Sequence, residues 1–106
     1  MLTYGADGWT ALGDPTRREI FERLAVRPRA VGELARELPV SRPAVSQHLK
    51  VLKEAGLVRD SANGNRRIYG VQPDGLAALR ADLERFWTQA LATYKQVVEQ
   101  STEEDS

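Results

Sequence analysis

Polar side chains that could contact a nucleic acid gather in the stretch SRPAVSQHLKVLKEAGLV, residues 41–58. If the stretch is helical, five of them fall within one arc of roughly 140°: Arg42, Ser46, Gln47, Lys50 and Lys53. Cations neutralise phosphates, and arginine, serine and glutamine can hydrogen-bond base edges. The other side of the helix is largely apolar and would be buried. A solvated polar face that binds nothing is the alternative, and this stretch alone leaves both interpretations open.

Both ends of this helix carry recognisable signals. Ser41 is a good N-cap, because its hydroxyl can accept a hydrogen bond from a free amide of the first turn. Pro43 falls in that first turn, where a missing N–H is tolerated. Gly56 is typical of the left-handed residue that ends a helix.

Three helices are predicted before this one. Trp9 and Leu12 suggest a short first helix that ends near Gly13, and apolar spacing predicts a second over residues 15–26. A shorter helix is expected over residues 31–38, with Ala30 as a poor cap and Pro39 at its end. Only two residues separate it from Ser41, which is the helix-turn-helix arrangement, with the second helix presented to the DNA major groove.

After this helix, the spacing of apolar residues changes from a helical period of 3.6 residues to a strand period of 2 residues. Residues 57–61 and 66–71 are predicted as two strands around Ala62-Asn63-Gly64-Asn65, because Asn-Gly favours a tight hairpin. Tyr69 and Val71 should share one face, with Ile68 on the other. Arg66 and Arg67 stand beside the tip, so the hairpin could be a wing that follows a phosphate backbone or enters a minor groove. A solvated hairpin is the alternative.

A long helix is predicted from about residue 74 to residue 100, roughly 40 Å in length. We expect Leu76, Leu79 and Leu83 to fold onto the chain's own core. The apolar stripe beyond them exceeds what one small domain can cover, which indicates a second copy. The predicted dimer interface comprises Trp9, Leu12, Phe86, Trp87, Ala90, Leu91, Tyr94 and Val97.

The bulk properties indicate one domain, residues 1–100, followed by an acidic frayed tail, residues 101–106. The chain has no cysteine, no recognisable signal peptide and no apolar run long enough for a membrane span, so we expect a cytoplasmic protein. Its net charge is zero, but residues 41–71 hold six Lys/Arg and two Asp/Glu. That local excess, rather than the total charge, is the footprint expected of a nucleic-acid surface.

Taken together, the motifs DPTRREIFERLA, VGELARELPVSRPAVSQHLKVLKEAGLV and RRIYGV resemble the ArsR/SmtB family of bacterial winged-helix repressors. The resemblance runs from about Leu12 to Trp87 and is closest to a cysteine-free, actinobacterial-type branch. It implies a mainly α fold, a winged helix-turn-helix of five helices with a two-stranded β-wing. It further implies a cytoplasmic homodimer, formed through the first and last helices, that binds an imperfect palindrome near a promoter, usually to repress it.

Residue by residue, the resemblance places Arg42, Ser46 and Gln47 toward the groove, and Ser41 and Lys50 toward phosphates. It gives two arginines to the wing. With the proline of the first turn, the predicted DNA-binding set is Ser41, Arg42, Pro43, Ser46, Gln47, Lys50, Arg66 and Arg67.

The chain departs from metal-sensing members of that family. Ala35 and Glu37 stand where such members often carry a Cys-x-Cys pair, and the last predicted helix has no histidine. Its carboxylates, Asp74, Asp82, Glu84 and Glu99, would make a weak zinc site. We therefore expect no metal and no cofactor. His48 lies toward the buried side and is interpreted as structural rather than as a pH switch, and no constellation supports an enzyme.

Two other functions remain open from the sequence. A winged helix can serve as a protein-interaction module, with Trp87 to Val98 bound to a different chain. The repressor could also respond to a small hydrophobic ligand near Trp9, Phe86 and Trp87, although the sequence identifies neither a pocket nor an effector.

Overall fold

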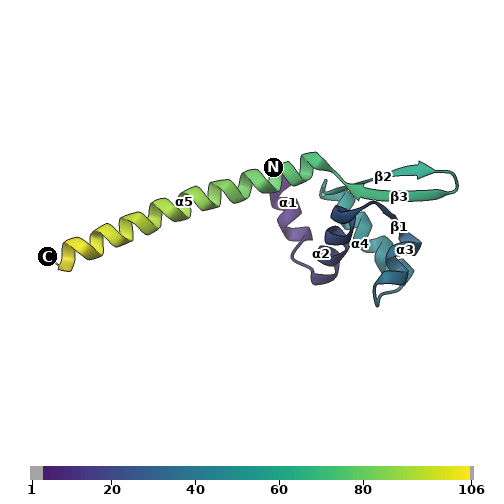
Figure 1. The fold of residues 1–106 in the computed structure, drawn as a ribbon, viewed down its shortest axis with the longest axis horizontal. Coiled ribbons are helices and arrows are strands. Elements are labelled where there is room, and N and C mark those ends of the chain that lie inside the picture. Colours follow the sequence, from purple (N-terminus) through teal and green to yellow (C-terminus); the bar gives the residue numbers. More distant parts are fainter. Residues whose placement is uncertain (1–3, 106) are drawn as a thin grey trace.

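The structure is a computed structural model that describes residues 4–105. Residues 1–3 of the predicted domain and Ser106 of the predicted tail lie outside this range. Helices and a small sheet form a compact head, from which the last helix projects (Figure 1). The element bounds are Tyr4–Ala11 (α1), Pro15–Val26 (α2), Arg29–Ala30 (β1), Val31–Glu37 (α3), Arg42–Glu54 (α4), Val58–Asn63 (β2), Arg66–Val71 (β3) and Pro73–Asp105 (α5).

Helices α2 and α4 begin where the sequence predicts. Asp14 Oδ1 accepts a hydrogen bond from the backbone N–H of Arg17 at 3.0 Å, and Ser41 Oγ accepts one from Ala44 at 3.2 Å. Both caps satisfy an amide that has no partner inside its helix. Ala30, which precedes α3, has no such oxygen.

The apolar side of α4 packs against α2 and α3, as predicted. The largest fully buried side chains of the head are Ile20, Leu34, Val45, Leu49, Leu52 and Leu57. Because these residues come from α2, α3, α4 and the residue before β2, a single core fixes the two helices of the helix-turn-helix relative to each other. That core leaves the polar side of α4 facing outward.

The sheet has three strands in the order β1-β3-β2, one more than predicted. The added strand β1 has two residues, and Arg29 and Ala30 pair with Tyr69 and Ile68 of β3. The hairpin turn is Gly64-Asn65, because Asn63 pairs with Arg66. Gly64 alone in this turn has a positive φ, 64°, the pattern of a type II′ turn, so the tip lies one residue later than an Asn-Gly turn would place it.

Helix α5 rests on α1 only at its beginning. Leu79 is buried there, but Leu76 and Leu83 are exposed, so the prediction that all three fold onto the core is wrong for two of them. Both of these leucines line an open apolar hollow beside Trp9 of α1. We expected a frayed tail after residue 100, whereas α5 continues to Asp105. Once a helix is formed, each further residue adds one backbone hydrogen bond.

Candidate nucleic-acid interface

The exposed face of α4 carries the side chains that the sequence assigned to this helix. Arg42, Pro43, Ser46, Gln47 and Lys50 are all exposed, while the opposite side of the helix is buried. Within residues 4–105, the side chains of Ser46, Gln47 and Lys50 make no hydrogen bond or ion pair. Their donors and acceptors are therefore available to a ligand. Ser41 is exposed too, although its hydroxyl oxygen already caps α4.

The two wing arginines stand beside the hairpin tip, and each is paired with an acid. Arg66 Nη2 donates to Glu33 Oε1 at 2.9 Å, and Arg67 Nη1 donates to Asp60 Oδ2 at 2.6 Å. Both guanidiniums remain more than half exposed. They can reach a ligand without leaving the surface, but the acids hold them in place beforehand.

Asp60 joins the wing to the recognition helix. Its side chain is only 6% exposed, and its second carboxylate oxygen lies 2.7 Å from Lys53 Nζ, near the end of α4. The hydrogen bond from Lys53 is the main reason why the pKa of Asp60 lies below its ordinary value, and Arg67 lowers that pKa further. Strand β2 and helix α4 thus share one buried negative charge.

Glu33, at the beginning of α3, also connects a helix to the wing. Its Oε1 accepts a hydrogen bond from the Ala30 amide at 3.2 Å, and its Oε2 lies 3.2 Å from Arg27. The Ala30 amide, followed by Arg27, holds the pKa of Glu33 below its ordinary value. Since Glu33 also pairs with Arg66, this one carboxylate connects the first helix of the helix-turn-helix to the wing.

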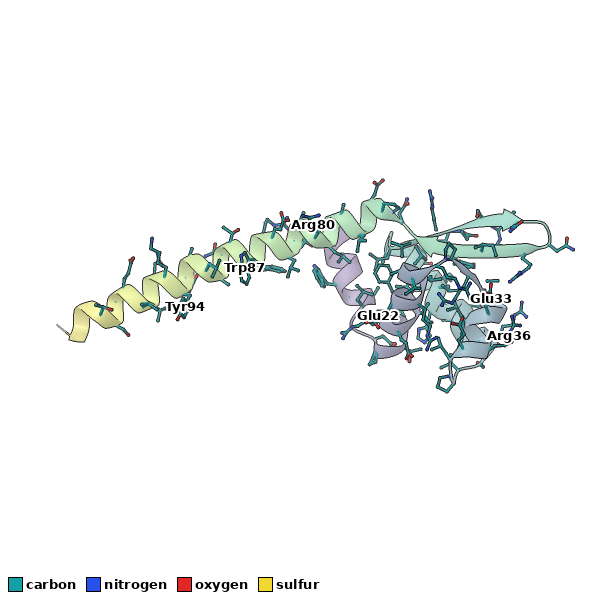
Figure 2. All side chains as sticks on the ribbon, in the orientation of Figure 1. Glu22, Glu33, Arg36, Arg80, Trp87 and Tyr94 are labelled. Carbon is teal, nitrogen blue, oxygen red and sulfur yellow. The ribbon has the colours of Figure 1, made fainter. Side chains whose placement is uncertain are left out.

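Arg36 on α3 is a functional candidate that the sequence reasoning missed (Figure 2). With Gly32, Glu33 and Arg42 it lines a groove of about 420 Å³ that the wing residues Asn65, Arg66 and Arg67 close on the other side. It lies one helical turn after Gly32 on the exposed side of α3, whereas Leu34 faces the core.

His48 lies on the inner part of α4 rather than on its exposed face. It is half-buried, and its Nδ1 lies 3.4 Å from Nη1 of Arg17, whose Nε donates to the Ala11 carbonyl at 2.8 Å. Asp14, nearby, has a pKa below its ordinary value because it accepts the Arg17 amide. This arrangement connects α1, α2 and α4, which supports the interpretation of His48 as a structural residue.

Acids do not gather into a metal site in the part of the chain that the structure describes. No group of three or more His, Cys, Asp or Glu side chains suitable for a metal ion occurs within residues 4–105. Glu37 pairs with Arg29 at 2.8 Å, and Asp82 accepts a hydrogen bond from Trp9 Nε1 at 3.2 Å.

None of the helices within residues 4–105 has the length and apolar content needed to cross a membrane.

The outer part of α5 presents large apolar side chains that this chain does not cover, including Trp87 and Tyr94 (Figure 2). The predicted interface residues Trp9, Phe86, Trp87, Ala90, Leu91, Tyr94 and Val97 are all exposed. Leu12 differs, because it is half-buried and packs against its own core. An apolar hollow of about 320 Å³ lies beside α1, lined by Trp9, Leu12, Phe21, Leu76, Leu79, Arg80 and Leu83. Phe86 and Trp87 do not line it.

Comparison with known proteins places these features among bacterial regulators. The model of the family described as "bacterial regulatory protein, arsR family" matches residues 14–60. The HTH-type transcriptional regulator Rv2034 of Mycobacterium tuberculosis is 64% identical over 101 residues, which are 93% of this chain and 94% of that protein. The transcriptional repressor SdpR of Bacillus subtilis is 34% identical over 61 residues, 58% of this chain and 68% of its own.

Solved structures agree with this assignment. An ArsR-like transcriptional regulator from Rhodococcus sp. RHA1 superposes with a TM-score of 0.74 at 35% identity, over 89% of this chain and 92% of that one. The homodimeric winged helix-turn-helix DNA-binding domain of Mb0332 from Mycobacterium bovis, a possible ArsR-family regulator, gives a TM-score of 0.66 at 28% identity. The match covers 83% of this chain and 82% of that domain.

Proposed function

Because the chain belongs to the ArsR family of bacterial regulatory proteins, and is therefore a winged helix-turn-helix transcriptional regulator, we propose that it represses transcription as a homodimer bound to an imperfect palindrome. One observation supports the DNA-binding surface above all: on the polar face of α4, the exposed side chains of Ser46, Gln47 and Lys50 have no partner within residues 4–105, beside a wing that carries two arginines. Repression is supported by SdpR, which is named as a transcriptional repressor.

In this proposal the N-terminal half of α4 enters the major groove. Ser46 and Gln47 face base edges, and Ser41, Pro43 and Lys50 flank them along the phosphates. Arg66 and Arg67 of the wing contact the adjacent backbone or minor groove. The contacts to bases would determine sequence preference, whereas the cations would supply most of the salt-dependent affinity.

The second partner is another copy of the chain. The homodimeric Mb0332 domain supports this, and so does the exposed stripe of α5. Two α5 helices paired antiparallel would lay the outer half of each against the inner half and the α1 of the other. That pairing places the partner over the hollow beside Trp9. A second copy would therefore occupy the surface that a foreign protein or a hydrophobic ligand would need.

Selection of bound DNA from a random pool tests the proposed function directly. We expect a two-fold related motif whose half-sites are centred about 10–11 bp apart, one helical turn of DNA. Light scattering in the same buffer should give the mass of a dimer. The proposal is wrong if no motif is enriched at low salt and the protein also fails to bind its own upstream region.

A further inference from the structure

The groove between α3, α4 and the wing contains more positive charge than its acidic partners neutralise. Four arginines and one acid lie along its walls: Arg36, Arg42, Arg66, Arg67 and Glu33. They come from three different elements, α3, α4 and β3, so the charge is brought together by the fold and not by one run of sequence.

Two of these guanidiniums are already neutralised. Arg66 is paired with Glu33 at 2.9 Å, and Arg67 with Asp60 at 2.6 Å. Glu33 adds no free negative charge to the groove, because Arg27 also lies 3.2 Å from its carboxylate. Arg36 and Arg42, by contrast, make no hydrogen bond or ion pair with any residue in the range 4–105. The groove therefore keeps two unpaired guanidiniums.

These two guanidiniums converge on one point above the backbone of α3. A Cβ atom added to Gly32 would lie 3.6 Å from Nη1 of Arg42 and 3.7 Å from Nη1 of Arg36. Because both Nη1 atoms lie this close to one point, a phosphate can bridge them by accepting a hydrogen bond of about 2.9 Å on each of two oxygens. Arginine forks suit such an anion better than lysine does, because their N–H groups are planar and fixed.

We propose that the groove binds one phosphodiester of the DNA backbone between Arg36 and Arg42. The proposal rests on the proposed function and adds to it in two ways. It makes Arg36, on the first helix of the helix-turn-helix, a DNA contact. It also moves Arg42 from the base edges to the backbone, so that sequence preference is left chiefly to Ser46 and Gln47.

The salt dependence of DNA binding tests this assignment. Each lost phosphate contact lowers the slope of log K against log salt by about 0.9, so Arg36→Ala should lower it by about 1.8 for a dimer with two grooves. If the lost contacts contribute nothing at 1 M sodium chloride, this change in slope corresponds to a loss of roughly sixtyfold in affinity at 0.1 M. Arg36→Lys should restore most of the slope and part of the affinity. Arg59→Ala, which removes an exposed arginine at the base of the wing that does not line the groove, is the matched control and should leave the slope unchanged.

Substitution of the DNA locates the phosphate. On the selected site, each phosphate is replaced in turn by a neutral methylphosphonate, and wild-type and Arg36→Ala proteins are compared. One position in each half-site should weaken binding of the wild type clearly more than binding of the variant, in which Arg42 alone still contacts that phosphate. All measurements use chloride salts, so a free phosphate ion does not compete.

The outcomes separate the two proposals. If the wild type binds the selected site but Arg36→Ala keeps the same slope, or is as sensitive as the wild type at every position, the phosphate site is wrong and the proposed function stands. If the wild type binds no DNA, the proposed function itself fails. Arg36 is exposed and unpaired in the described chain, so its loss should leave the urea midpoint unchanged and a folding defect would be detected separately.

Discussion

Asp60 on β2 accepts a hydrogen bond from Arg67 on β3 at 2.6 Å, diagonally across the two strands of the wing. The same carboxylate meets Lys53 of α4 at 2.7 Å and is almost hidden from solvent. Salt screens such a pair less than it screens an exposed one. Asp60 therefore sets the position of the wing relative to the recognition helix, and both elements must fit the same DNA.

Asp60→Asn should destabilise the protein by about 1–3 kcal/mol, because it leaves two cations without their shared partner. It should also weaken DNA binding, although the variant is more positive and simple charge attraction predicts tighter binding. Urea unfolding and fluorescence anisotropy with a selected DNA site measure the two effects. Glu54→Gln is the control, since it removes an exposed acid of α4 that has no ion partner among the described residues, and it should tighten binding. Tighter binding by Asp60→Asn would refute the positioning role.

The lowered pKa of Asp60 gives this contribution a definite pH dependence. A carboxyl whose folded pKa is below its unfolded value stabilises the fold above the unfolded value, which is about 3.9 for aspartate. The stabilisation is lost as the pH falls through the folded pKa. The difference in free energy of unfolding between wild type and Asp60→Asn should therefore be constant above about pH 5 and should shrink as the pH falls toward 3. A difference that grows as the solution becomes more acidic would contradict this.

Gln47→Ala should change which sequences are bound more than how strongly DNA is bound in general. The Gln47 amide is exposed and makes no side-chain bond within the described residues, so it is free to read a base edge. Loss of such a contact relaxes discrimination at one position by about 1–3 kcal/mol. Repeating the random-pool selection should show one position per half-site with weaker preference. Lys50→Ala should instead weaken all sequences alike, and identical motifs for wild type and Gln47→Ala would argue against base readout.

The sequence predicted most of this fold because its local signals agree with one another. Asp14-Pro15 and Ser41 begin helices, the apolar spacing of α4 matches the core, and an Asn-Gly pair marks the hairpin. Each of these signals lies within a few residues of the structure that it specifies. Strand β1 carried no such signal, because two residues have no period and it forms only by pairing with β3.

The site was predictable only in part, because some of its contacts join residues that are distant in the sequence. The exposed face of α4 follows from a helical projection of one segment. The partners Glu33–Arg66 and Asp60–Arg67 are 33 and 7 residues apart, and the groove at Arg36 joins three elements. Contacts of this kind depend on how helices and wing pack together, which neither composition nor spacing reports.

Gly75→Ala should destabilise the protein by about 1–3 kcal/mol, although alanine favours helices. A Cβ at this position of α5 would lie 2.0 Å from the Gly56 carbonyl oxygen, so α5 must move away from the loop before β2. Gly32→Ala is the control, because the nearest atoms to its Cβ lie at 3.6 Å on a flexible side chain. It should be neutral or slightly stabilising. Equal stability of the two variants in urea would show that α5 is not held at this contact.

The antiparallel pairing of α5 that we propose for the dimer brings particular charges together. Glu84 and Lys95 are eleven residues apart, slightly more than three full turns, and so lie on the same flank of the helix. In an antiparallel pair of identical helices, a flank faces the same flank of its partner. With the two-fold axis midway between these residues, Glu84 of each copy faces Lys95 of the other. The exposed apolar side chains, among them Trp87, Leu91 and Tyr94, then alternate along the seam between the helices.

A charge swap tests this register. Glu84→Lys and Lys95→Glu should each place like charges opposite one another twice per dimer. An exposed ion pair contributes about 0.2–1 kcal/mol, and its reversal costs a similar amount. We therefore expect each single variant to weaken dimerisation by about tenfold. The double variant should recover the affinity of the wild type, because each ion pair is rebuilt with its signs exchanged. Sedimentation equilibrium at 0.05 M and 0.5 M salt measures the constants, and the higher salt should reduce all differences. A double variant as weak as the single ones would exclude this register, whereas Trp87→Glu should abolish dimerisation in any pairing that buries the stripe.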